Sequence, residues 1–143
     1  MASKRENVAR LRAVPMFSDL SQRDLARIWD TMKIVQHAPG HDIVVEGKAG
    51  HGFHLILDGE VQVARKGKRL KLGANQFFGE MSLIDDGPRT AAVTAATPVV
   101  TATLSSGGFR SIAKKNPEMM WKLLVVMTQR LREEQSINAT LTS

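Results

Sequence analysis

The sequence predicts a mainly β fold with flanking helices (α+β), in which helices precede and follow an antiparallel β-roll or jelly roll. Residues 1–36 and 107–143 show the apolar spacing of amphipathic helices, whereas residues 37–106 hold short β-rich runs separated by glycines. A parallel sheet needs helical crossovers between its strands, and the middle region has none. We therefore expect one domain, residues 1–143, with a β-roll at its centre.

The composition is typical of a single soluble globular domain. The chain has 143 residues, of which 43% are hydrophobic and 24% are charged, so it can bury a core of ordinary size. No apolar run approaches about eighteen residues and the N-terminus lacks a signal-peptide core, so we expect neither membrane insertion nor export. The absence of cysteine excludes disulfides and thiolate chemistry and is consistent with a cytoplasmic protein.

The net charge of +6 raises the question of a nucleic-acid partner. Residues 1–36 contain seven basic and four acidic residues, residues 110–143 contain six and three, and residues 37–109 contain seven of each. The excess therefore lies in the helical flanks. Within the neutral middle, the basic run 65–71 surrounds a glycine and predicts a solvated hairpin tip, with phosphate or acidic-partner contact as the alternative.

Capping signals predict two helices before the roll. Ser3 and Glu6 have the spacing of a capping box, residues 14–17 break the first helix, and Ser21 marks a second start. The second helix has one apolar face, formed by Leu25, Ile28, Trp29 and Met32.

Six short runs rich in β-formers follow the turn at Pro39-Gly40. The predicted strands are 43–45, 53–57, 61–63, 70–72, 91–94 and 99–104. Gly107 and Gly108 are expected to end the last strand.

A short helix around Phe109 and a longer one complete the predicted elements. Asn116 and Pro117 supply a cap and a proline for the first helical position, and the longer helix is expected to run to about Ile137. Its apolar spacings of four, three and four resemble a heptad seam, formed by Met120, Leu124, Met127 and Leu131. Both internal packing alone and an additional homodimer contact are compatible with this seam.

The run from Phe78 to Ala91 concentrates the chemistry of the chain. Apolar residues after Gly79 predict one helical turn, whose start offers free N–H groups and a partial positive charge to an anion. Arg89 provides a planar fork suited to two phosphate oxygens. The carboxylate of Glu80 repels a phosphate but can accept hydrogen bonds from a neighbouring ribose hydroxyl. Together these residues predict a site for a sugar phosphate.

The order Phe78-Gly79-Glu80-Met81-Ser82-Leu83, followed by Pro88-Arg89-Thr90-Ala91, resembles the phosphate-binding cassette of the cyclic nucleotide-binding domain family. This family includes catabolite activator proteins and the regulatory subunits of cAMP-dependent kinase. The resemblance implies that Glu80 holds the ribose 2′-hydroxyl and Arg89 the cyclic phosphate. The remaining ligand-binding residues that it implies in the cassette are Gly79, Met81, Ser82, Thr90 and Ala91.

The resemblance also implies how the base is held. The base would rest on Val61, Val63 and Leu72, with the C-terminal helix as a lid whose Glu134 or Gln135 reaches the base edge. The first expected ligand is cAMP. Because the hydroxyl of Thr90 can accept a hydrogen bond from a guanine amino group, cGMP is a second possibility.

The implied function is regulatory, without catalysis and without a further cofactor. Ligand binding would reposition the C-terminal helices and signal to an effector protein that the sequence does not identify. The chain ends at Ser143, so no DNA-binding domain is expected after the long helix. The alternative is a degenerate β-roll that binds proteins and no longer binds nucleotide.

Two positions depart from the pattern of this family. Lys48 stands where an acidic residue is common and His54 where an aromatic residue is common. Both positions belong to the scaffold by resemblance, so the expectation of ligand binding is retained.

A jelly roll with several histidines also raises a metal-binding cupin as an alternative. His51 and His54 are three residues apart, and ligands on one face of a strand lie an even number apart. His37 and His41 are expected to precede the strands. The chain has no dinucleotide, triphosphate-loop or serine-hydrolase motif, so neither an enzyme nor a metal site is expected.

Overall fold

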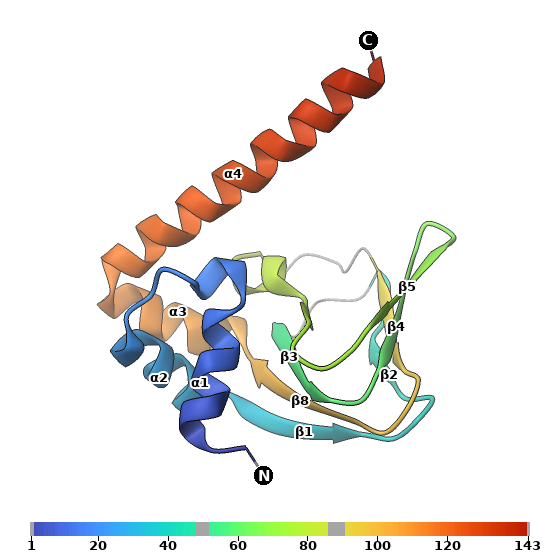
Figure 1. The fold of residues 1–143 in the computed structure, drawn as a ribbon, viewed down its shortest axis with the longest axis horizontal. Helices are drawn as coiled ribbons and strands as arrows, with labels where there is room; N and C mark the ends of the chain where they lie inside the picture. Colours follow the sequence, from blue (N-terminus) through green and yellow to red (C-terminus); the bar gives the residue numbers. More distant parts are fainter. Residues whose placement is uncertain (1, 48–51, 86–90, 143) are drawn as a thin grey trace.

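The computed structural model describes residues 2–47, 52–85 and 91–142. It contains two four-stranded antiparallel sheets that form a β-roll, with helices before and after it. Figure 1 shows α1, α2 and α3 grouped at one end of the roll, while α4 extends away from it. The predicted fold class is confirmed.

The N-terminal helices begin where their capping residues predict. In α1 (Lys4–Arg12) the Ser3 hydroxyl accepts a hydrogen bond from the Glu6 backbone N–H at 3.2 Å, and Ser21 caps α2 (Gln22–Thr31) in the same way. A single 3₁₀ turn, η1 (Pro15–Phe17), separates the two helices. The apolar faces of these elements are buried against the roll.

The first sheet has the order β1-β8-β3-β6. Its strands are β1 (Lys33–His37), β8 (Val99–Leu104), β3 (Phe53–Asp58) and β6 (Phe77–Phe78). Strand β1 corrects two expectations, since it lies in the segment assigned to the N-terminal helices and it contains His37, which was expected to precede the strands. As an edge strand that pairs only with β8, β1 is largely exposed, so it lacks the alternation that marks a half-buried strand.

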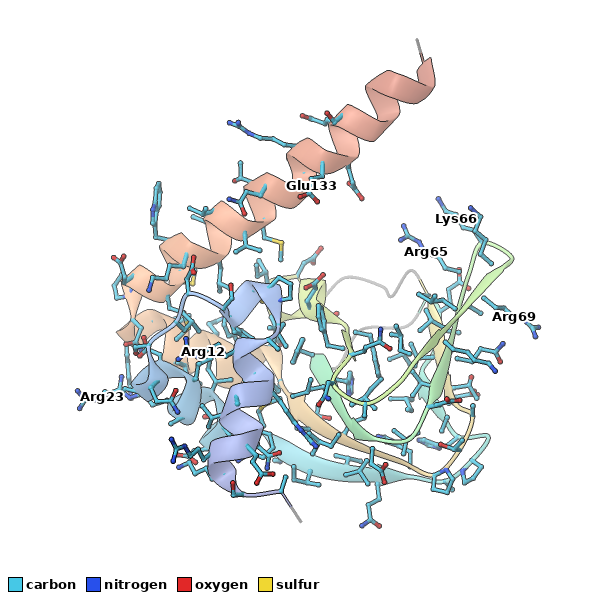
Figure 2. The ribbon with its side chains drawn as sticks, in the orientation of Figure 1. Arg12, Arg23, Arg65, Lys66, Arg69 and Glu133 are labelled. Atoms are coloured by element: carbon cyan, nitrogen blue, oxygen red, sulfur yellow. The ribbon has the colours of Figure 1, made fainter. Side chains whose placement is uncertain are left out.

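The second sheet has the order β2-β7-β4-β5. Its strands are β2 (Asp42–Val44), β7 (Ala92–Ala95), β4 (Val61–Arg65) and β5 (Lys68–Leu72). A two-residue turn joins β4 to β5, so the basic run forms a hairpin tip, as predicted. Figure 2 shows Arg65, Lys66 and Arg69 projecting from this tip into solvent.

Two apolar clusters fill the molecule. The first lies between the helices and the first sheet and includes Phe17, Phe53 and Leu104. The second lies inside the roll, where Ile56 and Val99 of the first sheet meet Val61 and Val93 of the second. Burial of these side chains contributes most of the stabilisation at roughly 25 cal/mol per Å² of apolar surface.

The C-terminal region differs from the prediction at the pair Gly107-Gly108. These glycines lie inside α3 (Ser106–Lys115), whereas β8 already ends at Leu104. Ser105 is the actual signal, because its hydroxyl accepts a hydrogen bond from the Gly108 N–H at 3.0 Å and thereby starts the helix. Helix α4 (Pro117–Thr142) extends beyond the expected end near Ile137.

The predicted seam of α4 does not pack on the domain as a unit. Met120 is 45% exposed, and Leu124 and Leu131 are each 56% exposed, while Met119 and Leu123 are buried in the helical cluster. The face that α4 buries therefore lies one residue earlier along the helix than the heptad spacing indicated. Of the four seam residues, Met127 packs against the cluster.

The turn at Gly59 tests how closely the segment between β3 and β4 packs against the residues at the start of β8. Gly59 has a φ of +92°, and a Cβ at this position would lie 2.2 Å from the Pro98 carbonyl oxygen. We expect Gly59→Ala to lower the free energy of unfolding by about 3 kcal/mol, because the clash adds to the strained φ.

The matched control is Gly67→Ala in the exposed turn between β4 and β5. Gly67 has a φ of +78° with no atom within 4 Å of the added Cβ, so the φ strain alone should cost about 1 kcal/mol. Chemical denaturation of both variants measures the difference, and equal losses would contradict the assigned clash.

Candidate functional site

The cassette begins where β6 leaves the first sheet. Phe78 pairs with His54 across the β3–β6 ladder, and Gly79 then takes a φ of +84°. This left-handed turn, which favours glycine, leads directly into the 3₁₀ helix η2 (Glu80–Leu83). The Ser82 N–H donates to the Gly79 carbonyl at 3.1 Å and closes the turn. The helical turn predicted after Gly79 is confirmed, as a 3₁₀ helix.

The residues of η2 are held firmly against the domain. Ser82 and Leu83 are buried, and η2 packs on β3 and on α3. Glu80 is half-buried at the first position of η2, and its oxygen Oε2 is shielded from solvent. The Glu80 carboxylate is thus fixed by a short, packed element rather than carried on a free loop.

The second half of the predicted site is only partly described. Arg89 and Thr90 lie outside the described residues, as does the side chain of Met81. Ala91 is half-buried and immediately precedes β7. The proposed arrangement of Glu80 and Arg89 around one ligand therefore stays a prediction from the sequence motif.

The three residues expected to support the base share one face of the second sheet. Val61 and Val63 are two residues apart on β4, and Leu72 of β5 is the cross-strand partner of Val61. Val61 is completely buried in the cluster inside the roll, whereas Val63 and Leu72 are half-buried at its margin. The margin is where an apolar ligand surface can reach this face. Phe78 packs against the same cluster, which brings the start of the cassette to it.

His54 takes over the packing role of an aromatic residue. Its ring stacks on Phe78 with centroids 4.7 Å apart and an interplanar angle of 16°. Its Nδ1 lies 3.1 Å from the Thr103 hydroxyl, on the neighbouring strand. His54 is buried beneath the cassette, which explains how the chain departs from the usual aromatic residue without losing the support of Phe78.

The lid residues are remote from the sheet in this conformation. Glu134 and Gln135 are exposed near the distal end of α4. Residues of α4 contact η1 and α3, and the helix extends away from the roll (Figure 1). Contact between these two side chains and a bound base would require a different position of α4.

The histidines show no metal-binding arrangement within the described residues. No group of three His, Cys, Asp or Glu side chains there is close enough to hold an ion. His37 stacks on His41 with centroids 5.4 Å apart, and the pKa of His37 is lowered first by burial and second by the neighbouring His41. His51 lies outside the described residues.

Sequence reasoning did not anticipate a cavity beside the cassette. This cavity of about 440 Å³ lies between η2, α3 and the start of α4. The sequence shows only the apolar run Leu83-Ile84 and the i, i+4 pair Phe109 and Ala113, which predicted helical segments and not a cavity between them.

Comparison with known proteins assigns the chain to a family. Residues 34–116 match the family model of the cyclic nucleotide-binding domain, a span that includes the whole cassette. The chain belongs to the cyclic nucleotide-binding domain family. The resemblance of the cassette motif is thereby confirmed at the level of the family.

The curated relatives of this cyclic nucleotide-binding domain are regulatory proteins. The chain is 36% identical to a cAMP-dependent protein kinase regulatory subunit of Yarrowia lipolytica over 105 residues, or 71% of the chain and 28% of that relative. It is 28% identical to a CRP-like cAMP-activated global transcriptional regulator of Mycobacterium tuberculosis over 132 residues, or 88% of the chain and 59% of that relative. The chain thus spans about a quarter of the kinase regulatory subunit.

Solved structures agree with the fold. The N-terminal domain of a transcriptional regulator from Streptomyces coelicolor superimposes with a TM-score of 0.80 at 30% identity, covering 90% of this chain and 93% of that one. The catabolite activator protein of Thermus thermophilus gives a TM-score of 0.74 at 25% identity, covering 90% of this chain and 63% of that one.

Among the described residues, no helix combines the length and hydropathy that a membrane span requires.

Proposed function

We propose that this domain binds cAMP in preference to cGMP and signals by repositioning its C-terminal helices, without catalysis of its own. The observation that carries the proposal is the complete cassette motif, from Phe78 to Ala91, within a chain of the cyclic nucleotide-binding domain family. The described half of that motif supports it, because Gly79 makes the left-handed turn and the carboxylate of Glu80 is fixed on η2.

The proposed ligand contacts divide between one acid and one base. Glu80 accepts hydrogen bonds from the ribose 2′-hydroxyl, and Arg89 forms two parallel hydrogen bonds to the cyclic phosphate. Backbone N–H groups around Gly79 and Ala91 complete the phosphate contacts. The base lies against the margin of the roll at Val63 and Leu72, which are half-buried.

The choice of cAMP rests on the named relatives. One is the regulatory subunit of a cAMP-dependent protein kinase and another is a cAMP-activated transcriptional regulator. Similarity to two proteins whose names specify the same nucleotide supports cAMP over cGMP for this chain. The hydroxyl of Thr90 is the feature that would admit cGMP as a second ligand.

The proposed signal is a shift between two positions of α3 and α4. Helix η2 packs on α3, and α3 packs on α4, so a ligand that displaces η2 also displaces the helices. Such a shift requires that the nucleotide bind the two positions with different affinity. In the described position α4 leaves the roll uncovered, and the nucleotide-bound position would bring Glu134 and Gln135 toward the base.

The partners of the module are an effector protein and a second copy of the chain. The exposed seam residues Met120, Leu124 and Leu131 lie with Trp121, which is 65% exposed, on the first half and middle of α4. Exposed apolar residues repeated along one helix are typical of helix-to-helix contact. We propose that α4 forms a homodimer contact through this seam.

A thermal shift measurement tests nucleotide binding directly. At a hundred times its dissociation constant, cAMP should raise the free energy of unfolding by about 2.7 kcal/mol, which corresponds to roughly 5 to 10 °C in the melting temperature. At equal concentration cGMP should give a smaller shift. No shift with either nucleotide would instead favour the β-roll as a protein-interaction domain.

Substitution of Arg89 tests the phosphate contact. We expect Arg89→Ala to weaken cAMP binding by about 3 kcal/mol, or more than a hundredfold, because the desolvated phosphate loses its counter-charge. Arg89→Lys keeps the charge but loses the planar fork, so its loss should be intermediate. Calorimetry measures both affinities, and an unchanged affinity in Arg89→Ala would refute the assignment.

The pair of Glu80→Gln with 2′-deoxy-cAMP tests the ribose contact. Glu80→Gln should weaken cAMP binding less than Arg89→Ala does, because the amide oxygen can still accept from the ribose hydroxyl and only the strengthening by the negative charge is lost. Because 2′-deoxy-cAMP lacks the hydroxyl, it should bind the variant and the parent about equally. Calorimetry measures the affinity of each of the two proteins for each of the two ligands. If Glu80→Gln greatly lowered the affinity for 2′-deoxy-cAMP, the assigned contact between Glu80 and the 2′-hydroxyl would be contradicted.

A further inference from the structure

The cavity between η2, α3 and α4 has the size and lining of a small-molecule site. Its volume of about 440 Å³ lies within the range of roughly 300–1,000 Å³ that is usual for ligand pockets. The junction of these elements lies at the helical end of the molecule (Figure 1). The lining residues are Leu83, Ile84, Phe109, Arg110, Ala113, Lys114, Pro117 and Met120.

The floor and walls of the cavity are apolar. Leu83, Phe109 and Ala113 are buried and form the floor, while Ile84 and Met120 are exposed and form walls. Such a surface gains free energy when an apolar group displaces water from it. The floor is built by the cassette helix and by α3 together.

The two polar side chains among the described lining residues are both cationic. Arg110 and Lys114 lie four residues apart on α3, so they occupy the same helix face one turn apart. Both are exposed, and neither forms an ion pair or a hydrogen bond with any residue that the structure describes. Among the residues that the structure describes, no acidic side chain lines the cavity. The rim therefore offers two positive charges above an apolar floor.

We propose that this cavity binds a small amphipathic carboxylate, whose apolar body occupies the floor and whose carboxylate lies between Arg110 and Lys114. The charge of the rim selects an anionic head group, and the guanidinium of Arg110 suits two carboxylate oxygens. A cyclic nucleotide fits this cavity poorly, because none of the described lining side chains is a carboxylate that could accept from the ribose hydroxyl. The site is therefore distinct from the proposed nucleotide contacts of Glu80 and Arg89, although Leu83 and Ile84 of its lining belong to the same segment.

Binding here would act on the elements that carry the signal. An occupant contacts Leu83 of η2, Phe109 of α3 and Met120 of α4 at once. It would favour whichever relative position of the three elements fits it best.

Octanoate is a suitable probe because it combines an eight-carbon chain with one carboxylate. Calorimetry on the full chain, below the micelle concentration and without nucleotide, should detect octanoate binding. Octan-1-ol and octylammonium, which share the chain, should bind at least about tenfold more weakly, because they lack the negative charge. Equal binding of the three compounds would overturn the proposal.

Three variants locate the site. The double variant Arg110→Ala, Lys114→Ala should lower octanoate affinity about tenfold, whereas Lys115→Ala, which removes a neighbouring exposed lysine outside the lining, should leave it unchanged. Met120→Glu places a negative charge on an exposed wall and should abolish octanoate binding without loss of the fold, which circular dichroism verifies.

The outcomes also separate this site from the nucleotide site. Octanoate binding that is unaffected by either lining variant would place the ligand elsewhere and overturn the assignment. Absence of octanoate binding, together with a dimer in sedimentation whose association Met120→Glu abolishes, would make the cavity part of an interface between copies. Neither result depends on cAMP, so failure of this proposal is distinguishable from failure of the nucleotide assignment.

Discussion

The two ends of the segment from Phe78 to Leu83 are packed in two separate apolar clusters, and this double anchoring links the cassette to both the roll and the helices. Phe78 packs against the cluster inside the roll, while Leu83, five residues later, is buried in the cluster between the helices and the first sheet. The left-handed turn at Gly79 makes the change of direction between them. A ligand that moves η2 must therefore disturb the packing of the helices, because Leu83 is shared with them.

This shared packing is the physical basis of the proposed coupling between the nucleotide site and the C-terminal helices. Leu83 belongs to the same cluster as Phe109 of α3 and as Met119 and Leu123 of α4. Close-packed interiors transmit displacement rather than absorbing it. The cavity beside η2 lies at the same junction, where the three elements meet incompletely. A molecule bound there would contact Leu83, the same residue through which the proposed nucleotide signal reaches the helices.

Most of the fold was predictable because its signals are local. Ser3 and Ser21 cap the first two helices as their spacing indicated, and the glycine-punctuated β-runs form two antiparallel sheets. Prediction was wrong where tertiary partners decide. Strand β1 has one neighbour and an exposed pattern, and the helix-starting role of Ser105 was hidden by the glycine pair that follows it. The cassette motif was recognisable in the sequence and its family is confirmed, while the ligand contacts stay a prediction; the support that His54 gives Phe78 was not predictable.

By itself, the sequence determined the fold class, the cassette motif and the family, because capping residues, glycine turns and a motif of fixed order are properties of short segments. Tertiary structure alone decided which face of α4 is buried. Heptad spacing placed Met120, Leu124 and Leu131 on one face, but the neighbouring Met119 and Leu123 are the residues in the core. The buried face depends on how α4 is oriented when it packs against the domain, which its own apolar spacing does not fix. The cavity has the same origin, since it is a space between three elements and no one of them contains it.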